Sequence, residues 1–288
     1  MNKRSIKIHT IITILSFITI GLQFGSYYFL SSLFPAILIS IFLNLILSHF
    51  YLEASLSYTS CFLQSLITTI GSSLLILLIY YYQNGSLLIY KHTLLSLILL
   101  NWLVPFLYCI IRNFMDRGPR FVNFHSFFVK TSVLFAGYYV FFFIKHYFIF
   151  PVSFPETLSS IQNTMIPFLA TATYIEDSIY LGLKLPTLLI FIAKSFLLFA
   201  PMGFYASILL KEASRIFIFL LTFLLPLAAE MIPLLFQGSF YMDTYLFHLM
   251  GCLLGIILYQ ILNYLSQECL QCDFPDERSR YSFFNFYY

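Results

Sequence analysis

The sequence contains few charged residues. Asp, Glu, Lys and Arg make up 9% of its 288 residues, whereas a soluble domain carries about 25%. Hydrophobic residues reach 60%, aromatic residues 20%, and the mean hydropathy is +0.87. No soluble fold of this length could hide so much apolar side chain from water, and lipid removes the need to hide it. The composition therefore predicts an integral membrane protein whose surroundings are membrane lipids.

Several other features are missing. There is no run of basic residues, so nothing indicates a nucleic-acid partner. No H-E-x-x-H, G-x-S-x-G or Walker motif occurs, which leaves any catalytic residue unknown. The five cysteines do not resemble a disulfide framework, and Cys269 and Cys272 offer only two of the four ligands of a structural zinc site. We therefore expect no metal and no cofactor.

Long apolar segments fill most of the chain. A transmembrane helix needs about 20 apolar residues. Eight segments are close to this length: roughly 8–30, 33–50, 60–82, 93–112, 128–150, 187–210, 216–237 and 244–265. The first follows a basic N-terminus, but it is long and has no small-residue cleavage site, so we interpret it as a retained anchor. The pattern predicts an all-α, polytopic transmembrane helical bundle of about eight spans.

Residues 151–186 form the only long stretch between spans. In residues 151–186, the stretch Ser153–Glu156 resembles a capping box with a proline in the first turn, which predicts a short helix there. The rest of 151–186 mixes acidic, aromatic and apolar residues, as expected for a helix or loop at the outer interface. The acidic, Tyr-rich tail from Gln267 is expected to be poorly ordered.

Lys and Arg are distributed unevenly between the two sides. With the N-terminus inside, 11 lie on the cytoplasmic side and 4 on the outer side, which accounts for all 15. Cytoplasmic loops are enriched in these residues, and the loop from Arg112 to Lys130 is the strongest inside anchor. An even number of spans returns the C-terminus to the cytoplasm. We therefore predict a multi-pass protein with both termini cytoplasmic.

Three ionisable residues lie inside predicted spans: Lys194, Glu230 and His248. Such residues are costly in hydrocarbon and are functional candidates by default. At about 1.5 Å per residue, all three fall roughly 6–10 Å below the outer surface. We expect Lys194 and Glu230 to face each other, because either charge alone would be costly. The alternatives are that Lys194 extends to the outer headgroups and that His248 is a packing histidine.

Helical spacing places other residues beside these three. Glu230 shares one stripe with Gln237, and His248 shares another with Gly251 and Gly255. The G-x-x-x-G spacing lets two membrane helices approach closely, so His248 should point at protein, against a neighbouring span. The candidate ligand-pocket residues are Lys194, Ser195, Glu230, Gln237, Asp243 and His248, with Glu230 and His248 the candidates for any catalysis. Asp243 is also placed to be an ordinary helix-start residue.

Three stretches of the second half share an order and spacing with a known family. They are N-T-M-I-P-F at 163–168, F-A-P-M-G-F at 199–204, and Glu230 followed by Asp243 and H-L-M-G-C-L-L-G at 248–255. These stretches resemble the N-x-I-P-F segment, the F-x-P-x-G-F signature, and the glutamate, acidic turn and N-x-x-G-x-x-x-G helix of the VanZ-like family of bacterial membrane proteins.

The chain departs from the family pattern at polar positions. His248 stands where Asn is usual, and Ser195 replaces a frequent Asn. Pro233 stands where a Gln is common, and Thr244 replaces the second acidic residue of the turn. The glutamate position is retained.

The resemblance covers residues 128–265 and implies a domain of about four spans there. Residues 1–127 then form an N-terminal extension of about four spans, and 266–288 form a cytoplasmic tail. The family is associated with resistance to the glycopeptide antibiotic teicoplanin without altered peptidoglycan precursors. The resemblance therefore implies a role in the bacterial cell envelope, at the cytoplasmic membrane.

Three functions fit these observations. The preferred one is a non-enzymatic envelope protein whose outward-facing polar pocket receives a lipid, a glycopeptide or a lipid-linked wall precursor. The second is a membrane enzyme acting on such a lipid, with Glu230 as acid or base and His248 assisting. The third is a transporter, which the lack of a recognisable inverted repeat disfavours.

The topology can be tested by cysteine labelling or reporter fusions after Pro155 and after Gln267. The positive-inside distribution predicts labelling from outside at the first position and from inside at the second. Labelling of the tail from outside would contradict either the orientation or the even number of spans.

Overall fold

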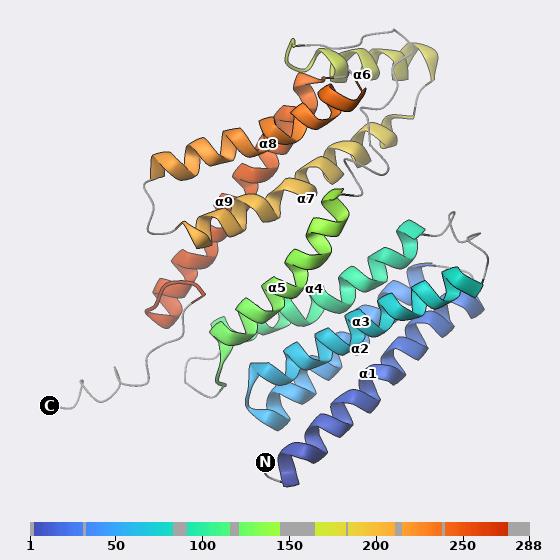
Figure 1. Cartoon of the computed structure of the whole chain (residues 1–288), viewed down its shortest axis with the longest axis vertical. Coiled ribbons are helices and arrows are strands. Elements are labelled where there is room, and N and C mark those ends of the chain that lie inside the picture. The colour runs from blue at the N-terminus through green and yellow to red at the C-terminus, as the bar shows by residue number, and fades with distance from the viewer. Residues whose placement is uncertain are drawn as a thin grey trace, which may run out of the picture. The chain divides into compact units, whose positions relative to one another are not determined.

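The fold was analysed in a computed structural model, which describes residues 3–30, 33–82, 91–115, 121–144, 165–182, 184–210, 215–237 and 240–275. Within these ranges the regular elements are helices: α1 (Lys3–Leu30), α2 (Leu33–Ser55), α3 (Tyr58–Tyr82), α4 (Lys91–Met115), α5 (Phe124–Ile144), α6 (Leu169–Leu181), α7 (Leu185–Leu209), α8 (Arg215–Gln237) and α9 (Met242–Leu270). Figure 1 shows their arrangement.

Each of the eight predicted spans contains one long helix, which confirms the all-α, polytopic bundle. In the part of the chain that the structure describes, seven helices are long and apolar enough to cross a membrane. The apolar stretch described in α8, Ile216–Ile232, is shorter, so this eighth span stays a prediction. The additional helix α6 lies in the predicted interfacial segment 151–186. The helix expected at Ser153–Glu156 falls outside the described residues.

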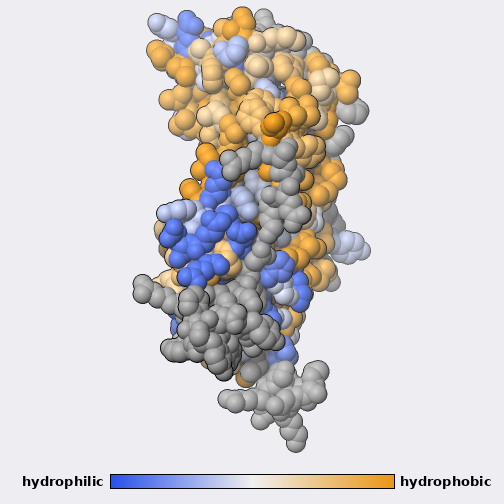
Figure 2. Space-filling model, turned by 90° about the vertical axis from the view of Figure 1, so that its left-hand side faces the viewer, coloured by the Kyte–Doolittle hydropathy of each residue, from blue (hydrophilic) through white to orange (hydrophobic). Residues whose placement is uncertain are grey.

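The outer faces of the helices are apolar. Large side chains such as Phe17, Leu77 and Leu197 are 60%, 61% and 70% exposed, and hydrophobic residues cover much of the face drawn in Figure 2. Apolar surface of this extent needs lipid to cover it. Several hydroxyl groups within the helices bond to the backbone of their own helix, as where Thr222 donates to the carbonyl of Ile218 at 2.7 Å.

The chain divides into two compact units. The first comprises residues 1–137 with 265–288, and the second comprises residues 138–264. The chain passes between them within α5 and again within α9. The family-like domain predicted for residues 128–265 stays a prediction.

In the first unit, α1, α2, α3 and α4 pack as a four-helix bundle (Figure 1). The first half of α5 is fixed against α4 by Trp102. The Trp102 indole stacks on Phe135 with ring centroids 4.4 Å apart, and its Nε1 donates to the carbonyl of Thr131 at 3.0 Å. An indole that has both apolar contact and a partner for its N–H is well suited to a buried position.

The expectation that the tail is poorly ordered from Gln267 is wrong for its described part. Helix α9 continues to Leu270, and Phe274 is only 1% exposed. The Phe274 ring packs edge-on against Phe128, with centroids 5.1 Å apart, and also contacts Phe124. The apolar ring returns the chain to the first unit despite the polar sequence around it. Residues 276–288 lie outside the description.

In the second unit, α7 and α9 approach at backbone distance. A Cβ added to Gly251 would lie 2.6 Å from the carbonyl oxygen of Phe196. A Cβ on Gly255 would overlap the carbonyl of Ala200, and one on Gly203 of α7 would overlap the backbone of Cys252. The prediction that Gly251 and Gly255 press against a neighbouring span is therefore confirmed, and that span is α7. Small residues allow this approach in a membrane.

Gly251→Leu and Gly255→Leu should each lower the melting temperature or the yield in detergent, since forcing larger groups into a packed interface costs about 1–3 kcal/mol or more. The matched control is Gly21→Leu, because a Cβ at Gly21 has no atom within 4 Å. Silent substitutions at both α9 positions would contradict the close approach of α7 and α9.

Candidate functional site

The second unit contains a buried pair of ionisable side chains. Glu230 of α8 and His248 of α9 are 3% and 1% exposed. The His248 Nδ1 lies 2.8 Å from Glu230 Oε1, although the two are not aligned well enough to form a hydrogen bond. The contact is an ion pair when the imidazole is protonated. In either state each group gives the other a polar neighbour within the hydrocarbon, where an isolated charge is costly.

Aromatic and aliphatic groups surround this pair. The Phe199 ring of α7 stacks on the His248 imidazole with centroids 4.1 Å apart and an interplanar angle of 25°. Phe199 also packs with Ala229 and Cys252, so α7, α8 and α9 all meet at this point. The close approach of α7 to α9 at the glycines brings the stacked rings together. The pair therefore lies in an apolar enclosure, which strengthens its electrostatic interaction.

Two prolines of α8 modify the backbone next to Glu230. Pro226 is buried one turn before it, and Pro233 follows three residues later. A proline inside a helix has no N–H to give to the carbonyl four residues earlier. Pro226 and Pro233 therefore free the carbonyls of Thr222 and Ala229 from the helix ladder.

Asp243 is the helix-start residue that the sequence suggested, and it also contacts another helix. It lies in the first turn of α9 and is fully buried. Its Oδ2 accepts hydrogen bonds from the backbone N–H of Thr171 at 2.7 Å and from the Thr171 hydroxyl at 2.6 Å. The residue before α6, Phe168, makes no side-chain cap, so Asp243 supplies the acceptor that the first turn of α6 needs.

This contact holds α6 across the end of the second unit where α7 and α9 begin (Figure 1). Ala170 and Tyr174 of α6 pack against Leu188, Phe191 and Phe247 below them. The Tyr174 hydroxyl also donates to the carbonyl of Lys184 at 3.2 Å. Helix α6 thus covers the end of the unit that lies nearest to His248, about two turns along α9 from its start.

The expected ion pair between Lys194 and Glu230 is wrong. The Lys194 side chain is exposed on α7, and His248 takes the place beside Glu230. The exposure of Lys194 leaves the alternative prediction, in which a long basic side chain extends along apolar surface toward the headgroups. Its neighbour Ser195 is buried, one turn before Phe199. The side chain of Gln237 lies outside the description.

The sequence reasoning missed a polar core in the first unit. Asn101 of α4 and Gln23 of α1 exchange two amide hydrogen bonds of 2.6 and 3.0 Å. Asn44 donates to the same Asn101 oxygen at 2.9 Å, and the Asn101 amide donates to Ser72 at 2.9 Å. All four residues are fully buried. Neutral amides did not stand out in a search for ionisable groups, yet the i, i+4 and i+8 spacing of polar residues on α2 and α3 was a usable signal.

This polar core links all four helices of the bundle and satisfies its own donors and acceptors. The polar core is better suited to holding the helices together than to binding a ligand or to catalysis. Hydrogen bonds between membrane helices contribute about 0.6 kcal/mol each to stability. In the described ranges no three His, Cys, Asp or Glu side chains lie close enough to hold a metal ion. The Glu230–His248 pair is therefore the stronger candidate for function.

No family model, curated protein or solved structure matches this chain.

A double-mutant cycle tests the pair. Removing one partner of a buried pair costs about 3–5 kcal/mol, and removing both can be nearly neutral. Glu230→Leu and His248→Phe should each lower the melting temperature, and the double variant should recover much of the loss. Lys194→Met is the control and should change stability by less than about 0.5 kcal/mol, as for a surface residue. Strictly additive losses would contradict the coupling.

Proposed function

We propose that this integral membrane protein is a VanZ-like protein of the bacterial cytoplasmic membrane that contributes to teicoplanin resistance. In this proposal, the region around Glu230 and His248 receives a lipid, a glycopeptide or a lipid-linked wall precursor from the outer side. Both termini are cytoplasmic, and α6 lies at the outer interface.

The observation that carries this proposal is the buried Glu230–His248 pair beneath α6. A membrane protein keeps ionisable groups at such a depth at a cost, and they mark sites that act on ligands or ions. Three further features support the same region. The family-like stretches at 199–204 and 248–255 supply Phe199, His248 and the three glycines of the α7–α9 contact. The acidic residue Asp243 of the family-like turn holds α6 over the site.

A membrane enzyme is the second candidate, and one distance favours it. A carboxylate oxygen 2.8 Å from an imidazole nitrogen is close enough to accept a proton from the ring once the two groups are aligned, as a general acid or base requires. The lipid-linked substrate would then have to reach the carboxylate between α7, α8 and α9. A binding protein needs only the polar surface, whereas an enzyme needs a Glu230 side chain that can take up and release a proton.

Glu230→Gln separates the two candidates. The amide keeps an oxygen facing His248 but cannot act as an acid or base. In a teicoplanin-sensitive bacterium, expression of the wild-type chain should raise the minimal inhibitory concentration of teicoplanin. A binding role predicts that Glu230→Gln retains most of this increase, while an enzyme would lose all of it and the wild type would generate a new lipid species by mass spectrometry.

His248→Phe and Lys194→Met complete the experiment. His248→Phe removes the polar group while keeping a ring against Phe199, so it should abolish the increase at normal protein levels. Lys194→Met should retain it, because Lys194 is exposed away from the pair. No change in teicoplanin sensitivity on expression of the wild-type chain would overturn the proposed function.

A further inference from the structure

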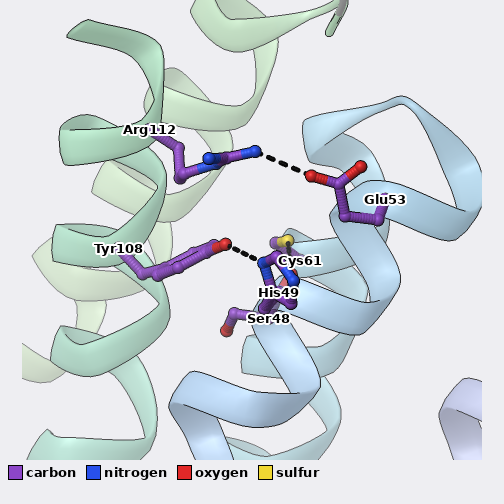
Figure 3. Close-up of polar contacts among 6 residues, drawn as sticks. All are labelled: Ser48, His49, Glu53, Cys61, Tyr108 and Arg112. Carbon is purple, nitrogen blue, oxygen red and sulfur yellow. Dashed lines mark hydrogen bonds and ion pairs between the residues drawn. The ribbon is translucent and has the colours of Figure 1, made fainter. Parts of the chain in front are cut away.

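A second polar group lies in the first unit, where α2 and α4 end. Two contacts bridge these helices (Figure 3). His49 Nδ1 lies 2.7 Å from the Tyr108 hydroxyl, and Arg112 Nη2 lies 2.7 Å from Glu53 Oε1. Each helix contributes its two residues four positions apart, so the contacts form two rungs about 6 Å apart along the helices. The Arg112–Glu53 rung lies nearer the C-terminal ends of the two helices, within one turn of Ser55 and Met115.

The Arg112–Glu53 rung is supported by the segment around Phe121 and is partly exposed. The Arg112 guanidinium lies over the Phe121 ring, 5.4 Å from its centroid. Backbone bonds between Val122 and both Leu56 and Tyr58 hold that segment in place. The Arg112 and Glu53 side chains are 21% and 27% exposed, so the pair is accessible. One contact to Glu53 uses a single donor of a guanidinium that has five.

The His49–Tyr108 rung is accessible as well. His49 is exposed, next to the exposed apolar residues Ile46 and Phe50. In the tautomer in which the Tyr108 hydroxyl donates to His49 Nδ1, the imidazole carries its own hydrogen on Nε2. A ring N–H at this position can donate to an acceptor that comes from the bilayer.

We propose that these two rungs bind an anionic phospholipid of the bilayer, with its phosphate on Arg112 and a glycerol ester carbonyl on His49. The order of the rungs matches the order of groups in a phospholipid. The phosphate lies nearest to water, the ester carbonyls lie a few ångströms deeper, and the acyl chains follow along apolar surface such as Ile46 and Phe50. Arginine forks suit phosphate oxygens, and basic sites at the ends of spans attract anionic lipids.

Glu53 has two opposing effects on lipid binding at this site. It orients the guanidinium through the 2.7 Å contact, but its charge opposes that of an anionic headgroup. Glu53→Gln keeps an oxygen for Arg112 and removes the opposing charge. The site should therefore bind anionic lipid more tightly in this variant, a gain that a misfolded protein could not produce.

Native mass spectrometry of the full chain in detergent with equal amounts of phosphatidylglycerol and phosphatidylcholine of the same acyl chains tests the proposal. The wild type should retain more phosphatidylglycerol. Arg112→Gln should reduce the retained phosphatidylglycerol about fivefold, as expected for one basic residue near an anionic surface. Glu53→Gln should increase it. Lys130→Gln, which removes an equal charge from an exposed position of α5, should leave it unchanged.

An ether-linked phosphatidylglycerol tests the His49–Tyr108 rung, because this lipid lacks the ester carbonyls. The wild type should retain the ester lipid more than the ether lipid, and His49→Phe should erase that difference. Equal retention of phosphatidylglycerol and phosphatidylcholine, or equal losses from Arg112→Gln and Lys130→Gln, would overturn the site. Neither outcome depends on the Glu230–His248 pair, so this proposal fails or holds separately from the proposed function.

Discussion

The structure depends on one constraint: the hydrocarbon of a bilayer offers no water to polar groups. Backbone groups meet it by forming helices, and several hydroxyls meet it by bonding back to their own helix, as Thr222 does. Larger polar side chains cannot be satisfied in this way. They must find partners on neighbouring helices, and those partners determine how the helices pack. The amides around Asn101 and the Glu230–His248 pair are both consequences of this constraint.

The two units satisfy the constraint with different chemistry. In the first unit, neutral amides and hydroxyls saturate one another, and the reciprocal Gln23–Asn101 bonds set the level of α1 against α4. Such a network has little left to offer a ligand. In the second unit, a carboxylate and an imidazole share one short contact within an apolar enclosure of Phe199 and its neighbours. Proton transfer and ligand recognition both need groups of this kind, so function is better sought in the second unit.

Helix approach and polar placement are linked in the second unit. Gly203, Gly251 and Gly255 let α7 and α9 meet at backbone distance. That approach brings Phe199 onto the His248 ring, and the ring in turn reaches Glu230 on α8. Asp243 connects the start of α9 to α6, so a single helix supplies both the imidazole and the carboxylate that positions the covering helix. Displacing α9 would therefore disturb the pair, the stacking and the cover together.

The sequence alone determined the eight long helices, because a bilayer requires apolar runs of a set length. It also identified the glycine face of α9. It did not determine partners. The sequence predicted a similar depth for Lys194 and Glu230, yet Lys194 is exposed on α7 and His248 lies beside Glu230. The burial of Phe274 and the Asp243–Thr171 contact were equally hidden. One helix's pattern gives depth and face, but the rotation of each helix against its neighbours is decided only when all of them pack.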